Sequence, residues 1–337
     1  MKAAVYTTYG PPEVIHLHET ETPVPKEKEV QVKVAASTVK FGDSYARHFN
    51  DVSPFQFTMP LPLWIPARLS MGWSKPKQPI LGSEFSGIIT AVGDKVTRFR
   101  PGEAVFGYTG QKFGAYAEYL CINADGIIAR QPENLTPEEA ATLPYGALMA
   151  LNLLRKADLK AKEKVLIIGA SGGIGSAAVQ LAKNYFGAEV TGVCSSAGTD
   201  YVKSLGADNV IDYTKEDFTK SETSFDVILD IPRKTSFSKG KPILRSGGRY
   251  MPVSFKGRHV LQRLLTIPRR KKVITALALE KTDDLLLIQE LAEIGKIKPV
   301  IARSFPLEQA AEAHRWFDEG GSRGSVVIRV NNGTNNL

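Results

Sequence analysis

Hydrophobic positions follow two different patterns along the chain, and the pattern changes near residue 164. Before that point, short β-like runs are separated by glycine and proline, which is typical of a small barrel or sandwich. These runs lie at residues 3–7, 14–18, 30–36, 86–92, 104–108 and 115–122. The first part of the chain is therefore predicted to form a β domain.

From residue 164 onward, apolar strands alternate with amphipathic helices, which indicates a parallel α/β layer. Strands are expected at 165–168, 189–194, 209–211, 225–231 and 273–277, and helices at 174–186, 199–205 and 283–294. The tail then predicts a strand at 300–303, a helix at 307–317 and a closing strand at 325–330. The polar segment 331–337 is expected to be disordered. A length of 337 residues fits two domains better than one or three.

Residues 50–78 fit neither pattern. The segment contains many prolines and the aromatic residues Phe55, Phe57, Trp64 and Trp73, without clean periodicity. A loop of this length in a compact domain is usually functional or disordered, and its aromatic content argues against disorder. The segment is predicted to be either a flap over the active site or a packing arm at a subunit interface.

Composition narrows the class of protein. The two cysteines, Cys121 and Cys194, lie far apart and form no spacing typical of a zinc site or disulfide framework. With no signal-peptide pattern and no long apolar run, a cytoplasmic protein with no membrane partner is expected. The net charge of +8 comes mostly from scattered side chains, so no nucleic-acid partner is expected. The dense run at residues 269–272 is interpreted as a solvated loop rather than a binding patch.

A glycine-rich turn follows the strand at 165–168. Its residues are Gly169, Ala170, Ser171, Gly172, Gly173, Ile174 and Gly175. A diphosphate needs backbone N–H groups free of side chains, together with a helix N-terminus. Gly169 suits the tight turn, Gly172 or Gly173 lets a pyrophosphate approach, and Gly175 permits helix and strand to pack closely. The turn predicts a dinucleotide site.

The end of the next strand indicates which dinucleotide is preferred. NAD-binding units carry an Asp or Glu there, and such a carboxylate would repel the 2′-phosphate of NADP. This chain has Ser195 and Ser196 instead, and Tyr213 is a further residue that could reach the same phosphate. NADP(H) is therefore the predicted cofactor. Because no Arg or Lys stands at the strand end, the preference is expected to be moderate.

With these features, the whole chain resembles the medium-chain dehydrogenase/reductase superfamily, in the zinc-free branch similar to quinone oxidoreductases. Besides the glycine-rich turn, the resemblance rests on YGPPE at residues 9–13, LGSEFSG at 81–87, VG at 92–93, RPGEAV at 100–105, GAYAEY at 114–119 and LGAD at 205–208. It implies a GroES-like, partly open β-barrel domain at residues 1–130, completed by 300–337. A Rossmann domain, a doubly wound parallel sheet, would occupy 131–299, and a homodimer is implied.

The departures from the superfamily concern metal. Zinc-dependent members carry a His where this chain has Ser83, and no Cys stands in residues 37–47 where another ligand would lie. No metal site is therefore expected, and Glu84 is interpreted as a structural carboxylate. Related reductases often carry Asn in the segment where Lys40 and Phe41 stand here. His16 and His18 share one face of a strand, which is interpreted as an exposed face.

These features predict a zinc-independent, NADPH-dependent oxidoreductase that transfers hydride to a quinone, enone, enal or other activated carbonyl compound. Two alternatives remain open: an enoyl-thioester reductase that holds coenzyme A or carrier-protein phosphates through residues 269–272, and a non-catalytic NADPH-binding interaction protein. Tyr45, with Asp43 beside it, is the predicted proton donor or positioner, and solvent is the alternative. If 42–47 is a short helix, Asp43 and Arg47 could form an ion pair.

Overall fold

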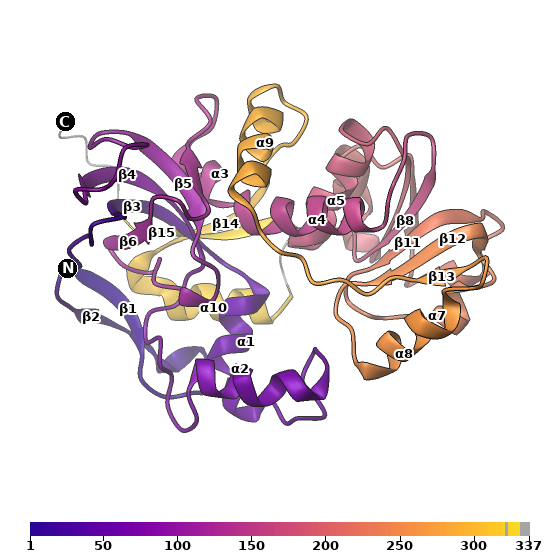
Figure 1. The fold of residues 1–337 in the computed structure, drawn as a ribbon, viewed down its shortest axis with the longest axis horizontal. Coiled ribbons are helices and arrows are strands. Elements are labelled where there is room, and N and C mark those ends of the chain that lie inside the picture. The colour runs from indigo at the N-terminus through magenta and orange to yellow at the C-terminus, as the bar shows by residue number, and fades with distance from the viewer. Residues whose placement is uncertain (321–322, 331–337) are drawn as a thin grey trace.

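The computed structural model describes residues 1–320 and 323–330, and the tail predicted to be disordered lies outside these residues. Two lobes lie side by side, one built from the two ends of the chain and the other from its middle (Figure 1). None of the described helices has the length and apolar character needed to cross a membrane.

The first lobe contains a seven-stranded sheet ordered β14-β15-β3-β4-β5-β7, in which β6 also pairs with β3. A separate two-stranded sheet joins β1 to β2. Along β3, Val30, Val32 and Val34 are buried while alternate residues point outward, as expected for a half-buried strand. The bounds are β1 (Lys2–Tyr6), β2 (Ile15–Glu19), β3 (Glu29–Val39), β4 (Glu84–Val92), β5 (Ala104–Tyr108), β6 (Tyr119–Asn123), β7 (Ile128–Arg130), β14 (Ile301–Pro306) and β15 (Ser325–Arg329).

The C-terminal strand β15 lies antiparallel to β3, with Val327 opposite Thr38. The sheet of the first lobe is thus completed by the last described strands. Helix α10 (Ala310–Asp318) joins these strands and packs against them, and helix α3 (Pro137–Ala141) packs on β3 and β4. The exposed strand face predicted for His16 and His18 is confirmed, since both side chains lie exposed on β2.

The second lobe contains a six-stranded parallel sheet ordered β10-β9-β8-β11-β12-β13. Counted from β8, this is the order 3-2-1-4-5-6 of the doubly wound dinucleotide-binding fold, whose switch point lies between the first and fourth strands. Here that point falls between β8 and β11. The bounds are β8 (Lys164–Ile168), β9 (Glu189–Cys194), β10 (Asn209–Asp212), β11 (Phe225–Asp230), β12 (Leu244–Pro252) and β13 (Lys272–Val273).

Four elements of this lobe differ from the sequence-based expectation, and two of them are helices that were not predicted, α7 (Phe237–Gly240) and α8 (Gly257–Thr266). Strand β12 was not predicted, because Gly247 and Gly248 interrupt its apolar pattern and Gly247 adopts a φ of +86°. The strand predicted at 273–277 is short: only Lys272–Val273 pair with β12. The remaining helices of the lobe are α5 (Gly173–Asn184), α6 (Thr199–Ser204) and α9 (Thr282–Glu293).

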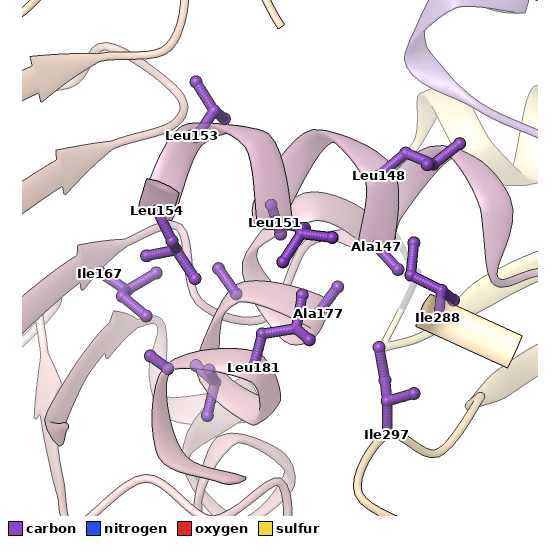
Figure 2. Close-up of a cluster of buried hydrophobic side chains, with 14 of the residues drawn as sticks. Ala147, Leu148, Leu151, Leu153, Leu154, Ile167, Ala177, Leu181, Ile288 and Ile297 are labelled. Carbon is purple, nitrogen blue, oxygen red and sulfur yellow. The ribbon is translucent and has the colours of Figure 1, made fainter. Parts of the chain in front are cut away.

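Helix α4 (Pro144–Lys156), also not predicted, connects the two lobes and packs on α5. Its buried side chains meet those of α5, β8 and α9 in one apolar cluster (Figure 2). The two helix backbones approach so closely that a Cβ at Gly146 would lie 2.7 Å from the Gly173 carbonyl oxygen. Helix α4 therefore fixes the N-terminus of α5, where the glycine-rich turn ends.

The aromatic segment at 50–78 is more regular than its sequence suggested, since it contains helix α2 (Trp64–Met71). Arg68 organises the segment: its guanidinium donates to the Phe49 and Trp73 carbonyl oxygens and lies over both aromatic rings. The segment also reaches the second lobe. Ser254 Oγ donates to the carbonyl oxygen of residue 58 at 2.6 Å, and Lys256 Nζ to that of Phe55 at 2.6 Å.

Candidate functional site

The glycine-rich turn begins where β8 ends, at the sheet's switch point. Gly169 has a φ of +82°, a conformation that residues with a Cβ rarely adopt. A Cβ at Gly175 would lie 2.1 Å from the Gly169 carbonyl oxygen, so only glycine lets α5 pack this closely on the turn. Gly173 faces open space, because a Cβ there would meet no heavy atom within 4 Å. The N-terminus of α5 is therefore free to meet a phosphate group.

A cavity of about 820 Å³ opens at the carboxyl ends of β8, β9 and β11. This volume lies in the range of small-molecule sites, and its place is where doubly wound sheets bind ligands. Four of the predicted cofactor residues line it: Ser171, Gly172, Ser195 and Tyr213. Gly169 lines it as well.

The other predicted cofactor residues lie around this cavity without lining it. Ala170 and Gly175 are buried beneath the turn, where they set its shape. Gly173 and Ile174 begin α5. Ser196 turns its hydroxyl toward the Asp212 carboxylate and the Thr214 hydroxyl, the latter at 3.0 Å. Ser195, rather than Ser196, is therefore the serine that lines the cavity.

Two cations that sequence reasoning missed also line the cavity, Lys215 and Lys234. Lys215 Nζ lies 3.5 Å from Asp212 Oδ2, at the end of β10. Hydrogen bonds from Ser196 and Thr214 lower the pKa of Asp212 to about 2, so this carboxylate is charged and already engaged. Strand order explains the position of Lys215: β9 and β10 are neighbours in the sheet, so residues that follow either strand meet at one edge.

Residues 42–47 lie in a short helix of the first lobe, α1 (Phe41–Arg47). The Tyr45 ring stacks on Phe41 with 5.4 Å between centroids and meets Phe49 edge-on at 5.6 Å. Its hydroxyl is buried beside Thr58, and burial raises its pKa above the ordinary value. Tyr45 therefore carries its proton at neutral pH.

Asp43 is fully buried, and its carboxylate accepts hydrogen bonds from the surrounding backbone. Its carboxylate accepts hydrogen bonds from the Lys40 N–H at 2.9 Å and the Gly82 N–H at 3.0 Å. Burial raises the pKa of Asp43 to about 7 despite these two bonds. Asp43 thus ties α1 to the loop that precedes β4.

The ion pair considered for Asp43 and Arg47 does not form. Arg47 instead donates to Asp318 Oδ2 at 2.5 Å and contacts His48 Nε2 at 2.8 Å. Although Asp43 and Arg47 are four residues apart, Asp43 points toward Gly82 and Arg47 toward the end of α10. Tertiary partners have overridden the pairing that helix spacing alone suggested.

Glu84 is a structural carboxylate, as predicted, and it connects the two lobes. It is fully buried, lies 3.2 Å from Lys40 Nζ, and accepts hydrogen bonds from the Thr38 hydroxyl and, at 2.6 Å, the Tyr145 N–H at the start of α4. Burial raises its pKa, and Lys40 opposes that shift. Among the described residues, no group of three or more His, Cys, Asp or Glu is arranged to hold a metal ion.

Family models match both parts of the chain. Residues 26–132 match the alcohol dehydrogenase GroES-like domain, and residues 205–328 match the family described as zinc-binding dehydrogenase. The solved structure of a quinone oxidoreductase from Coxiella burnetii superposes with a TM-score of 0.83 at 27% identity, covering 98% of this chain and 99% of that one. The fold assignment is therefore confirmed over nearly the whole chain.

Curated relatives agree. The human quinone oxidoreductase is 31% identical over 269 residues, which cover 75% of this chain and 81% of that protein. The 2-methylene-furan-3-one reductase of Solanum lycopersicum is 32% identical over 263 residues, covering 75% of this chain and 64% of that protein. These similarities agree with the strand order, the glycine-rich turn and the cavity beside it. The chain is an oxidoreductase of the medium-chain dehydrogenase/reductase superfamily and belongs to its quinone oxidoreductase-like branch.

Proposed function

We propose that this protein is a zinc-independent, NADPH-dependent oxidoreductase that reduces a quinone, enone, enal or other activated carbonyl compound. The observation that carries the proposal is the cavity at the switch point, lined by Ser195, Lys215 and Lys234. A hydroxyl and two cations suit a phosphate on the adenosine ribose, where an Asp or Glu would repel it. The quinone oxidoreductase and furanone reductase similarities support the acceptor class.

The nearby carboxylate of Asp212 does not oppose this cofactor choice. It accepts hydrogen bonds from Ser196, from the Thr214 N–H at 3.0 Å and from the Thr214 hydroxyl at 2.7 Å, and it lies near Lys215. Its charge is therefore engaged by three hydrogen bonds and partly offset by Lys215. Because Lys215 and Lys234 are exposed, the gain in affinity from each is expected to be modest.

When bound, NADPH supplies the hydride from C4 of its nicotinamide. The protein's own part is to bind, orient and donate a proton. The backbone N–H of Gly173, at the start of α5, would hold the diphosphate, whereas the Gly172 N–H donates to the Gly169 carbonyl oxygen at 3.2 Å within the turn. Tyr45, which keeps its proton at neutral pH, donates to the acceptor oxygen. Asp43 is placed as a positioning residue, because it holds α1 to Gly82 and so fixes the direction of Tyr45.

The proposal that the protein works without zinc rests on the side chains around Glu84. The ammonium of Lys40 lies 3.2 Å from this carboxylate, and it also donates to the Ser325 hydroxyl at 2.9 Å. A fixed protein cation thus balances the buried negative charge. Ser83, the neighbour of Glu84, offers a hydroxyl, which is a weak zinc ligand compared with His or Cys.

The test is NADPH oxidation by the purified chain with four acceptor classes: quinones, enones, saturated aldehydes and enoyl thioesters. Turnover with quinones or enones, little affected by salt, is the expected result. Turnover confined to enoyl thioesters, with a Michaelis constant that rises with salt, would instead identify an enoyl-thioester reductase that binds its substrate through residues 269–272. Tight NADPH binding without turnover of any class would indicate a non-catalytic binding protein.

A further inference from the structure

The aromatic segment at residues 50–78 is held to the second lobe by two side chains of that lobe. Ser254 Oγ donates to the Thr58 carbonyl oxygen at 2.6 Å, and Lys256 Nζ donates to the Phe55 carbonyl oxygen at 2.6 Å. Both acceptors are main-chain carbonyl oxygens. The contact therefore depends on the path of the segment's backbone and on the two donor side chains, and it does not depend on the side chains of Phe55 and Thr58.

The two donors lie shortly after β12, at the carboxyl edge of the parallel sheet. The Val253 N–H donates to the Asp230 carbonyl oxygen at 3.0 Å, so this connection continues beside the end of β11. Three residues that follow β11 line the cofactor cavity, namely Ile231, Pro232 and Lys234. Because doubly wound sheets bind their ligands at this edge, the segment is attached on the side of the second lobe where the cofactor is proposed to bind.

The same segment is anchored in the first lobe by contacts of its own. The Tyr9 hydroxyl donates to the Met71 carbonyl oxygen at 2.9 Å, and the guanidinium of Arg68 lies over the Tyr9 ring at 5.6 Å from its centroid. Trp64 Nε1 donates to the Val52 carbonyl oxygen at 3.1 Å, which joins α2 to the beginning of the segment. The segment therefore belongs to the first lobe, and the two donors after β12 connect it to the second.

The part of the segment that the second lobe holds covers the hydroxyl of Tyr45. This hydroxyl is buried beside Thr58, the residue whose carbonyl oxygen accepts the hydrogen bond from Ser254. Aromatic rings support the same region: Phe49 meets Tyr45 edge-on at 5.6 Å between centroids, and Phe57 meets Phe49 edge-on at 6.4 Å. Thr58 thus lies between the proposed proton donor and the second lobe.

We propose that Ser254 and Lys256 are positioning residues for the reduction, which hold the aromatic segment between the lobes and so fix the direction of the Tyr45 hydroxyl through Thr58. This inference rests on the proposed reductase function and adds two residues of the second lobe to the residues that carry it out. Of the two roles that the sequence left open for residues 50–78, it favours a flap over the active site.

Removal of the two donors should affect catalysis more than stability. Both side chains are partly exposed, so their hydrogen bonds stabilise the fold only slightly. The segment keeps its anchors in the first lobe, but residues 55–58 are released from the second lobe. Tyr45 then keeps its proton and loses its fixed direction, and a small displacement of a reacting group slows a reaction strongly. The acceptor site also loses one wall, so the KM for the acceptor rises.

The test is enone reduction at saturating NADPH by a double variant, Ser254→Ala with Lys256→Ala. Its single-turnover hydride transfer should slow by about tenfold or more, and its KM for the enone should rise by about tenfold, because the proton donor is displaced. Its Kd for NADPH should change little, since other residues line the cofactor cavity. Ser254→Thr with Lys256→Arg keeps both donors and should retain most of the rate. Ser238→Ala with Lys239→Ala, exposed on α7, is the matched control and should have no effect.

Two further measurements separate positioning from a purely structural role. In a Tyr45→Phe background, the double variant should slow hydride transfer no further, because the hydroxyl that the two side chains position is absent. Hydrogen exchange of residues 50–63, followed by mass spectrometry, should be faster in the double variant and unchanged in the control, because the segment has lost its contact with the second lobe. The exchange measurement needs no substrate, so it distinguishes a failure of this inference from a failure of the proposed function.

Three outcomes would overturn this inference alone. Unchanged exchange of residues 50–63 in the double variant would mean that the two side chains do not hold the segment. Faster exchange with an unchanged rate and KM would mean that the segment is held but does not position the acceptor or its proton donor. An equal loss of rate in the parent and Tyr45→Phe backgrounds would mean that the two side chains act other than through Tyr45. A parent protein that oxidises NADPH with no acceptor class would overturn the proposed function, and this inference with it, whatever the exchange result.

Discussion

Ser195 is the side chain on which the cofactor preference depends. It lines the cavity at the end of β9, while Ser196 is engaged by Asp212 and Thr214. Ser195→Asp should therefore raise the Kd for NADPH by about tenfold or more, because the new carboxylate repels the 2′-phosphate. Isothermal titration measures this, with Ser195→Ala and Ser196→Asp as the matched controls. An unchanged ratio of the NADPH and NADH dissociation constants in Ser195→Asp would contradict the assignment.

Tyr45 is the residue that we propose as the proton donor. Tyr45→Phe keeps the ring contacts with Phe41 and Phe49 and removes only the hydroxyl. Single-turnover hydride transfer to an enone at saturating NADPH should slow by about 10²-fold, as expected for loss of a general acid. Phe41→Leu, which changes the neighbouring ring without touching the hydroxyl, is the control. Equal rates in the parent and Tyr45→Phe, with enone and quinone alike, would leave solvent as the donor.

Asp43 predicts a pH dependence of stability. Burial raises its pKa to about 7 in the folded chain, above the ordinary value of 3.8. The folded state therefore holds more protons than the unfolded state between these values, so the contribution of Asp43 to the free energy of unfolding falls as pH rises through this window. Relative to Asp43→Asn, the parent should lose stability from pH 5 to about 7 and change little above that. Urea unfolding of both proteins across this range measures the sign. A parent that gains stability relative to Asp43→Asn as pH rises would refute the prediction.

At the scale of elements, two glycines of the glycine-rich turn have different roles. A Cβ at Gly175 would lie 2.1 Å from the Gly169 carbonyl oxygen, whereas one at Gly173 would meet nothing within 4 Å. Gly175→Ala should cost about 1–3 kcal/mol of unfolding free energy, because α5 must move away from β8. Gly173→Ala should cost far less and weaken NADPH binding instead. Urea unfolding distinguishes them, and equal losses of stability would argue against this packing.

The elements that sequence predicted best are those with clear periodicity. Strands β8, β9 and β11 and helix α5 all lie where the apolar pattern predicted them. Strand β12 was missed because Gly247 and Gly248 break its pattern, and it owes its place to pairing with β11. Tertiary pairing, which one sequence does not record, decided that element.

The site was predictable in part for a related reason. The glycines of the turn and Ser195 could be recognised from short sequence motifs, because the residues that define each motif lie close together in the chain. Lys215 and Lys234 approach the same cavity from the ends of β10 and β11. The two lysines converge on the cavity because of the order of the strands in the sheet, which the sequence does not record. Likewise the partner of Arg47 is Asp318, 271 residues away, and no helical spacing could have indicated it.

At the scale of the whole molecule, Glu84 joins the two lobes. Its carboxylate lies against Lys40 within the first lobe and accepts the Tyr145 N–H at the start of α4. Helix α4 in turn packs on α5 and positions the glycine-rich turn (Figure 2). One continuous set of contacts therefore connects the N-terminal end of α1, at Lys40, to the glycine-rich turn.

Hydride transfer from NADPH to an activated carbonyl compound without zinc is the central property proposed for this protein. The direct measurement uses NADPH carrying deuterium at both C4 positions, an enone acceptor, and protein whose metal content has been determined by elemental analysis. Deuterium on the former alkene carbon of the product, formed by protein with far less than one zinc per chain and unaffected by a chelator, is the predicted result. Product formed only by zinc-loaded protein, or product that contains no deuterium, would contradict it.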